Sequence, residues 1–178
     1  MKKLFLGIAF AVCSIFTLGA QGFVQGTNAI NVGAGFGGHY ESYYSSTTVS
    51  PVFSVSYDRG IWEIPGPGII SLGGYVGHRT IKYRFSSSDY KFSQTAIGVR
   101  PAYHYNGFEI DELDLYAGFL LGYYFYSDNQ GNNLRSYDNR LDHSGFIGAR
   151  WFFTEFLAAF VEAGYGISNI SGGVCFKF

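Results

Sequence analysis

Apolar residues recur at every second position over much of the chain, and this alternation constrains the fold more than any other feature. In the stretch that begins at Leu113, one face carries Leu115, Ala117, Phe119, Leu121, Tyr123 and Phe125, and the other carries Asp114, Tyr116, Gly118, Leu120 and Gly122. A period of two residues is that of a β-strand, because successive side chains of a strand point to opposite sides. Glycine recurs in these stretches and would weaken a helix by about 1 kcal/mol at each position, so the pattern predicts strands.

The alternation predicts eight strands in all. They are residues 28–37, 52–57, 69–85, 96–105, 113–125, 146–153, 159–167 and 170–178. In the third strand the alternation slips near residues 77–79, which indicates a bulge. Polar connections and turn-like connections alternate along the chain. The polar ones are residues 39–50, 86–90 and 127–142, and the turn-like ones are residues 58–68, 106–112 and 154–156. The last connection, at residues 168–169, falls on the same side of the sheet as the polar ones and is very short.

The first 22 residues have the three parts of a secretory signal peptide. Lys2 and Lys3 precede an apolar run over residues 4–16, and small residues follow, so we expect cleavage after Ala20 or Gly22. A membrane anchor is the alternative, but the run is shorter than the roughly 20 residues that a spanning helix needs. Residues 23–178 then form one domain. This domain keeps only Cys175, so it has no intramolecular disulfide.

Composition decides which face of the strands points outward. Charged residues make up 14% of the chain and aromatic residues 20%, whereas a soluble domain has about 25% charge. The less apolar face is mostly Gly, Ser and Tyr with isolated charges such as Arg100, Arg150 and Glu162, and most other charges, Asp58 among them, fall in the expected connections. A soluble barrel of the lipocalin kind would have no adequate polar surface. The sequence therefore predicts an all-β, eight-stranded antiparallel up-and-down barrel that spans a membrane with its apolar face toward lipid.

The signal peptide, the eight alternating strands and the last segment, Ile170 to Phe178, resemble the small bacterial outer-membrane β-barrel proteins of the OmpX, OmpA-barrel and opacity-protein type. Residues 113–118 and 161–166 are similar to those of small barrels common in Bacteroidetes-type bacteria. The resemblance covers residues 23–178. It implies residence in the outer membrane of a Gram-negative cell, with both mature termini in the periplasm. It also implies that the alternate apolar residues Val174, Phe176 and Phe178 form the signal read by the barrel-assembly machinery.

Arg150 and Glu162 suggest an ion pair inside the barrel. If the turn centres on Glu155, the paired residue numbers sum to about 310, so Arg150 lies opposite Phe160 and diagonal to Glu162. We expect these two residues to pair, with Arg100 and Lys177 as further members.

Three further patterns could indicate a cofactor site, a metal site or a catalytic triad, but none of them has the required context. Residues 33–38 match G-x-G-x-x-G, but a polar loop follows where a dinucleotide site needs a helix. The histidines lack metal-ligand spacing. In Asp142-His143-Ser144 the histidine and serine point to opposite faces of a strand, which is wrong for a catalytic triad. We therefore expect no cofactor, no metal and no enzymatic activity.

The chain carries 12 basic and 13 acidic residues, so nothing indicates a nucleic-acid partner. The leading hypothesis for function is structural or adhesive: the barrel contacts outer-membrane lipid and lipopolysaccharide and presents its polar loops to an extracellular ligand. A narrow porin-like channel is the first alternative, although eight strands leave an interior just wide enough for side chains. A lipid-modifying enzyme at the rim that uses His143 and Ser144 is the second.

Overall fold

The computed structural model describes residues 22–38, 47–84, 89–128 and 139–178. Nearly all of the predicted signal peptide lies outside these ranges, as do the central parts of the three long polar connections. No helix in the described ranges is long and apolar enough to cross a membrane.

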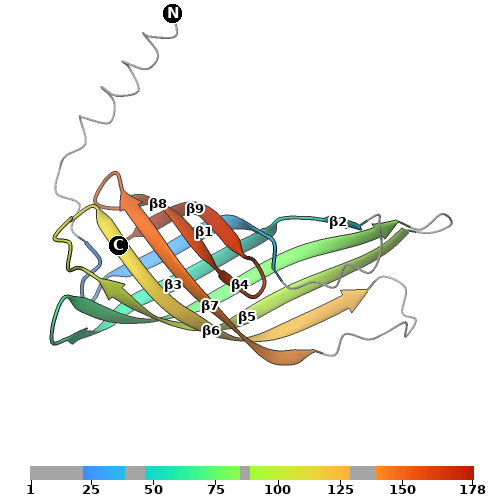
Figure 1. Ribbon diagram of the computed structural model, residues 1–178, viewed down its shortest axis with the longest axis horizontal. Coiled ribbons are helices and arrows are strands. Elements are labelled where there is room, and N and C mark those ends of the chain that lie inside the picture. Colours follow the sequence, from blue (N-terminus) through green and yellow to red (C-terminus); the bar gives the residue numbers. More distant parts are fainter. Residues whose placement is uncertain (1–21, 39–46, 85–88, 129–138) are drawn as a thin grey trace, which may run out of the picture.

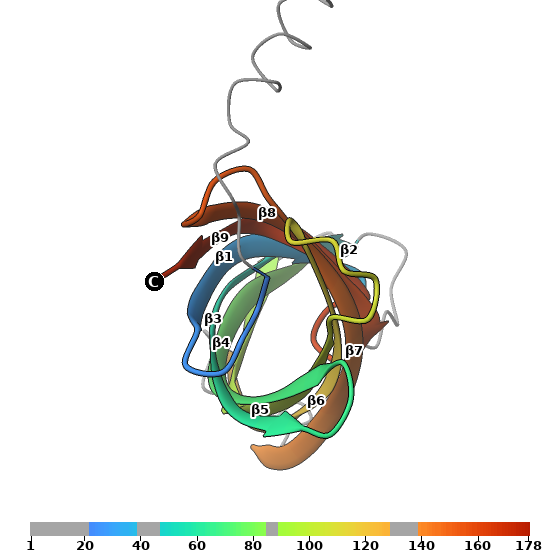
Figure 2. The ribbon, with the colours of Figure 1, turned by 90° about the vertical axis from the view of Figure 1, so that its left-hand side faces the viewer.

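The strands form one closed antiparallel sheet (Figures 1 and 2). They are β1 Asn28–Phe36, β2 Thr47–Val49, β3 Val52–Ile64, β4 Gly68–Arg84, β5 Asp89–Tyr105, β6 Leu113–Asp128, β7 Arg140–Phe152, β8 Leu157–Tyr165 and β9 Ile170–Lys177. The first and last strands pair with each other, and β4 pairs with β5, which closes the ring. The short β2 lies along β4 just beyond β3, so eight strands make up the circumference. The predicted eight-stranded barrel is confirmed.

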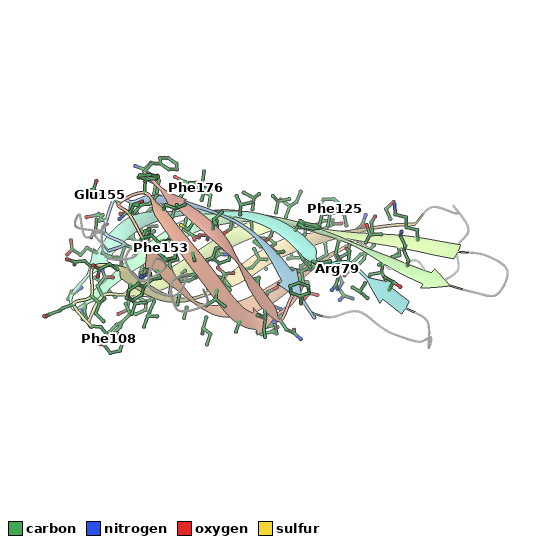
Figure 3. All side chains as sticks on the ribbon, turned by 90° about the horizontal axis from the view of Figure 1, so that it is seen from above. Arg79, Phe108, Phe125, Phe153, Glu155 and Phe176 are labelled. Carbon is green, nitrogen blue, oxygen red and sulfur yellow. The ribbon has the colours of Figure 1, made fainter. Side chains whose placement is uncertain are left out.

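The apolar and less apolar faces point as the alternation predicts. Side chains such as Phe176 and Phe125 stand on the outer surface (Figure 3), where Ile97, Val99 and Phe119 are each about half exposed. Side chains at the intervening positions are buried in the lumen. Ile167 is an exception. Alternation through the predicted strand 159–167 places it on the same apolar outer face as Val161 and Tyr165, but it is buried inside the barrel. The reason is that β8 ends at Tyr165, and the chain then turns inward through Gly166, whose φ is 130°.

The wall is taller on one side than on the other. β4 and β5 have 17 residues each and β6 has 16, whereas β1 and β8 have 9 and β9 has 8. The longer strands extend past the others at the end opposite the termini (Figure 1). We call this the loop end, and the end with both described termini and the turns at 65–67, 106–112 and 153–156 the terminal end.

These extensions correct the expected connections. β2, the start of β5, the end of β6 and the start of β7 all lie within residues assigned to polar loops. Hydrophobic alternation cannot reveal them, because strands that continue beyond an apolar environment carry polar residues on both faces. The turn expected at residues 58–68 is also too long, since β3 continues to Ile64. Asp58 therefore lies in a strand and not in a connection.

The bulge expected at residues 77–79 is wrong. β4 pairs with β5 in one unbroken register, from Gly68 opposite Tyr105 to Arg84 opposite Asp89. The register shift lies instead in β3, between Gly60 and Trp62. The alternation near residue 78 only appeared to slip, because the outward positions change there from apolar Val76 to polar His78.

Candidate functional site

A network of ion pairs crosses the lumen in its terminal half, and its centre is Arg150. This guanidinium is fully buried. It donates from Nη1 to Asp114 Oδ2 at 2.7 Å, from Nε to Asn31 Oδ1 at 3.0 Å, and from Nη2 to Asp58 Oδ2. Asp114 is on the neighbouring strand β6, but Asp58 is on β3, four positions away around an eight-stranded ring. The pair of Arg150 and Asp58 therefore connects opposite walls.

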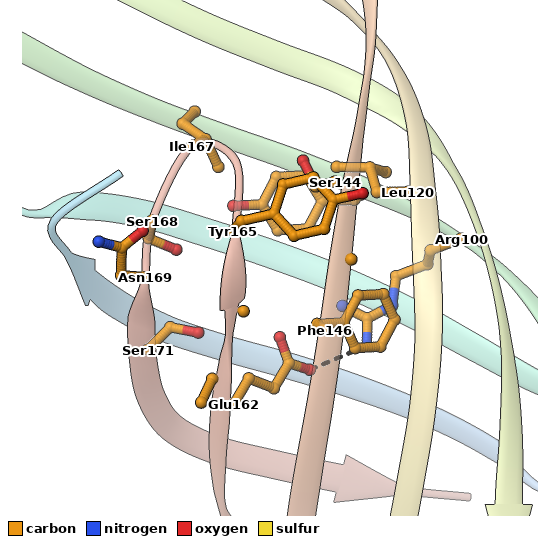
Figure 4. Close-up of a pocket in the computed structure, with 14 residues that line it drawn as sticks. Arg100, Leu120, Ser144, Phe146, Glu162, Tyr165, Ile167, Ser168, Asn169 and Ser171 are labelled. Atoms are coloured by element: carbon orange, nitrogen blue, oxygen red, sulfur yellow. Dashed lines mark hydrogen bonds and ion pairs between the residues drawn. The ribbon is translucent and has the colours of Figure 1, made fainter. Parts of the chain in front are cut away.

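Arg100 of β5 extends the network toward the loop end. Its Nη2 donates to Glu162 Oε1 on β8 at 2.8 Å (Figure 4). Its Nε lies 2.9 Å from Asp58 Oδ1. The guanidinium also lies 4.1 Å from the centre of the Phe146 ring. Glu162 Oε1 accepts a second hydrogen bond, from the Tyr116 hydroxyl at 2.8 Å. Asp58 thus joins the two arginines.

The structure places the predicted lumen residues differently in one respect. Arg150 is opposite Phe160, so the predicted register of β7 and β8 is confirmed. Its partners, however, are Asp58 and Asp114, and Glu162 binds Arg100. The predicted partner of Arg150 was wrong because its long side chain reaches across the lumen and not along the sheet. The ammonium of Lys177 lies 4.5 Å from the centre of the Phe152 ring.

Apolar clusters lie on both sides of the network along the barrel axis. The cluster at the terminal end consists of Phe23, Ala29, Ile69, Phe152, Ala158 and Cys175. The cluster toward the loop end consists of Val52, Ala96, Tyr124 and Ile167. Because these side chains exclude water, the ion pairs are held in a low-dielectric interior, where a charge without its partner costs several kcal/mol.

The segment before β1 closes the terminal end. The Phe23 ring stacks on the His104 imidazole at 3.8 Å between ring centroids, and the Phe23 carbonyl accepts a hydrogen bond of 2.9 Å from the Asn106 amide. Sequence reasoning gave this segment no role, because nothing in its pattern places it inside the barrel.

His104 joins two further side chains in an arrangement that resembles a catalytic triad. Its Nδ1 lies 2.8 Å from Asp114 Oδ1 and its Nε2 lies 2.9 Å from Ser71 Oγ. All three side chains are fully buried, and Phe23 covers the imidazole. A substrate cannot reach Ser71 in this structure, and Arg150 neutralises the carboxylate that would stabilise an imidazolium. We call the side chains that fill the terminal end of the lumen, among them Phe23 and His104, the plug. We interpret the arrangement of His104, Asp114 and Ser71 as a hydrogen-bonded part of this plug.

Asp142, His143 and Ser144 do not converge. His143 points outward and is largely exposed, whereas Ser144 is buried and shares a 2.8 Å hydrogen bond with the Tyr124 hydroxyl. Asp142 pairs with Arg140 at 3.1 Å, and its other carboxylate oxygen lies 3.8 Å from His143 Nδ1, but within the described residues neither Asp142 nor His143 contacts the Ser144 hydroxyl. The opposite orientations of His143 and Ser144 are those predicted for neighbouring residues of a strand.

Two cavities lie above the network, on the side of the loop end. The cavity in Figure 4 is lined by Arg100, Phe146, Glu162 and Tyr165, among others, and has a volume of about 40 Å³. A second cavity of about 230 Å³ lies at the rim between Tyr126, Arg140, Asp142 and Tyr165. No group of three or more His, Cys, Asp or Glu side chains that could hold a metal occurs in the described residues. Gly33 and Gly35 of the G-x-G-x-x-G motif lie within β1 and not before a helix.

Comparison with known proteins identifies the fold. No protein-family model and no curated protein matches the chain. Among solved structures, the N-terminal β-barrel domain of OprF from Pseudomonas aeruginosa is similar at 15% identity and a TM-score of 0.51, over 86% of this chain and 98% of that one. The outer membrane protein OprG from Pseudomonas aeruginosa is similar at 11% identity and a TM-score of 0.52, over 89% and 98%. The chain therefore has the fold of the small outer-membrane barrels.

Proposed function

We propose that this chain is an integral outer-membrane barrel with a closed lumen and a non-enzymatic role, either structural or adhesive, that is carried out by its loop end. Three features support insertion into a bilayer. The sheet is closed, so each of the eight strands of the circumference has a neighbour on both sides, as hydrocarbon requires. The outer wall exposes large apolar side chains from every long strand. The sequence begins with the pattern of an export signal.

The cross-lumen ion pair of Arg150 and Asp58 carries the proposal of a closed lumen. A solute moving along the axis would have to separate this pair and displace the apolar clusters on both sides of it. The cavity beside the network, at about 40 Å³, has room for only a few water molecules. A structural or adhesive role therefore fits better than conduction, and the functional surface is the taller wall with its loops.

In the orientation that we propose, the terminal end faces the periplasm. An even number of strands returns both termini to the same side, where the last residue is hydrogen-bonded to the first strand: Phe178 N donates to the Asn28 carbonyl at 3.0 Å. Phe178, Phe176 and Val174 all face outward at this end, in the position that we assign to the signal for the assembly machinery. The partners of the mature protein would be outer-membrane lipid, lipopolysaccharide and an extracellular ligand.

Cysteine labelling on intact cells tests location and orientation together. Asn139 at the loop end and Glu109 at the terminal end are both exposed, whereas the natural Cys175 is buried. In cells that express the full chain, we expect a membrane-impermeant maleimide to label Asn139→Cys and to leave Glu109→Cys and the wild type unlabelled. Lysis should make Glu109→Cys reactive. Labelling of Glu109→Cys alone on intact cells would reverse the orientation, and labelling of neither variant would contradict surface exposure.

A further inference from the structure

The wall of the barrel has a step at the loop end, where β7 continues above its neighbour β8. β7 pairs with β6 from Arg140 onward, but it pairs with β8 only from Gly145, opposite Tyr165. The cavity of about 230 Å³ lies at this step, and we call it the rim cavity. Tyr165 lines both the rim cavity and the cavity in Figure 4. The rim cavity therefore extends from the exposed rim toward the lumen.

The lining of the rim cavity combines flat aromatic rings with hydrogen-bonding groups. Tyr126 and Tyr165 supply rings, and Gln94, Arg140 and Asp142 supply an amide, a guanidinium and a carboxylate. A matching ligand has an apolar face for the rings and several hydrogen-bonding groups at its edge. A sugar in the pyranose form has both, because C–H groups cover its faces and hydroxyl groups surround its edge.

Arg140 and Asp142 form a partly exposed ion pair that uses only part of its hydrogen-bonding capacity. Arg140 donates from Nε at 3.3 Å and from Nη2 at 3.1 Å to the same oxygen, Asp142 Oδ2. Asp142 Oδ1 accepts a hydrogen bond of 2.9 Å from the His143 backbone N–H. Since a guanidinium has five N–H groups and a carboxylate has about four acceptor sites, the pair offers donors and acceptors side by side. Two adjacent sugar hydroxyls match it, because each can donate and accept.

The side chains on the lumen side of the rim cavity are held in place by their neighbours. Gln94 Oε1 accepts a hydrogen bond of 2.7 Å from Arg79 Nε, and Gln94 Nε2 donates to the Tyr126 hydroxyl at 3.2 Å. The Tyr126 ring stacks on Phe92 with 5.7 Å between ring centroids. Groups that are ordered before binding lose little entropy when a ligand arrives.

The Tyr165 ring lies against the sheet because Gly145 has no side chain. A Cβ at Gly145 would be 2.7 Å from Tyr165 Cε1. The His143 ring packs edge-on against the Tyr165 ring, with 5.9 Å between centroids. Tyr165 is nevertheless 47% exposed, so part of its surface is open to a ligand.

Charge and size indicate a single uncharged sugar unit. Among the described residues that line the rim cavity, one arginine and one aspartate carry the formal charges, so a net charge on the ligand would gain no attraction. The volume is below the roughly 300–1,000 Å³ of pockets for drug-sized ligands. The cavity therefore suits one ring of a longer glycan.

We propose that the rim cavity binds one uncharged pyranose unit of an extracellular glycan, with its C–H face on Tyr165 and two adjacent hydroxyls on Arg140 and Asp142. The site rests on the proposed function, since the loop end must face the outside of the cell. It deepens that function by naming the class of ligand and the side chains that contact it.

Saturation-transfer NMR on the refolded full chain, in a detergent without a sugar headgroup, tests the site. The probes are the methyl pyranosides of glucose, galactose, mannose and N-acetylglucosamine at millimolar concentration. At least one of them should bind the wild type, and its dissociation constant should rise about tenfold or more in Asp142→Ala, which removes a charged hydrogen-bonding partner. Asp111→Ala is the matched control, because it removes an exposed carboxylate at the terminal end, and it should bind as the wild type does.

Three results would overturn the site. They are the absence of saturation transfer to all four pyranosides in the wild type, equal dissociation constants for the wild type and Asp142→Ala, and tighter binding of methyl glucuronide than of methyl glucoside. Folding of each variant is established first by the heat-dependent shift in gel mobility. Location is tested separately by the cysteine labelling, so a barrel that labels as expected and binds no pyranoside would count against the rim cavity alone.

Competition distinguishes two sources of the sugar. The competitor is the polysaccharide released from the lipopolysaccharide of the producing cell. Displacement of the bound pyranoside would support a site for sugars of the cell's own surface. Retention of the pyranoside would support a site for a glycan of another surface.

Discussion

Arg150 on β7 and Asp58 on β3 stand on opposite walls of the barrel, and their ion pair spans the lumen. Neither residue is exposed to solvent, and Asp58 also contacts Arg100, so one carboxylate joins two guanidinium groups. The interior of the barrel is thereby held together by contacts that do not follow the sheet.

Replacement of Asp58 by Ala should destabilise the protein strongly. Two buried arginines would lose a partner, and removal of one member of a buried ion pair costs about 3–5 kcal/mol. Urea unfolding in lipid vesicles measures the effect. Arg59→Ala is the control at the next position, where the side chain is exposed on the outer surface, and it should change the free energy of unfolding by less than about 0.5 kcal/mol. Similar losses for both variants would contradict the role given to Asp58.

Replacement of Glu162 should lower the free energy of unfolding more than replacement of its outward neighbour Ala163. In Glu162→Ala the Arg100 guanidinium and the Tyr116 hydroxyl both lose their acceptor, whereas Glu162→Gln keeps an oxygen for one of them. We expect a loss of about 3–5 kcal/mol for the first variant and less for the second. Ala163→Gly, on the outer face, should cost about 1 kcal/mol or less. Equal unfolding midpoints of Glu162→Ala and Ala163→Gly would rule out the buried ion pair.

Phe23→Ala should open the terminal end. The ring is fully buried against His104, and replacing a buried Phe by Ala typically costs about 3–5 kcal/mol. Phe108, in a turn at the same end, is 60% exposed, so Phe108→Ala serves as the control and should have little effect. The same urea titration compares the two. A stable Phe23→Ala variant would show that the segment before β1 does not contribute to the plug.

Gly33 lies where the lumen wall meets the Phe160 ring. A Cβ at this position would be 2.5 Å from the Gly172 carbonyl oxygen and 2.7 Å from Phe160 Cζ. Gly33→Ala should therefore cost about 1–3 kcal/mol through overpacking. At Gly74, a Cβ would have its nearest neighbour at 3.8 Å, so Gly74→Ala should be neutral or slightly stabilising. An equally neutral Gly33→Ala would indicate that both the Phe160 ring and the backbone at Gly172 move aside freely.

The sequence predicts the parts of this structure that follow from neighbouring positions. Alternation assigns Arg100, Tyr116 and Glu162 to the lumen, and the turn at Glu155 places Arg150 opposite Phe160. These relationships depend on the period of a strand and on pairing across one hairpin, and both can be read from the chain.

Contacts across the lumen cannot be read in this way. The pairing of Arg150 with Asp58 depends on the diameter and closure of the barrel, which no local pattern encodes. Asp58 itself was assigned to a turn because Arg59 and Glu63 follow it and the Pro-Gly repeat begins soon after. The alternation does place Asp58 on the lumen face of a strand, since Ser54, Ser56 and Asp58 occupy successive lumen positions.

Ion conductance of the refolded wild-type protein in a planar bilayer tests the closed lumen most directly. A heat-dependent gel shift first establishes that the barrel is folded. The cross-lumen pair and the two apolar clusters predict that the inserted barrel produces no discrete conductance steps. Discrete steps in the wild type whose size changes in Glu162→Ala would contradict a closed lumen and would identify the protein as a narrow pore with an ionised interior.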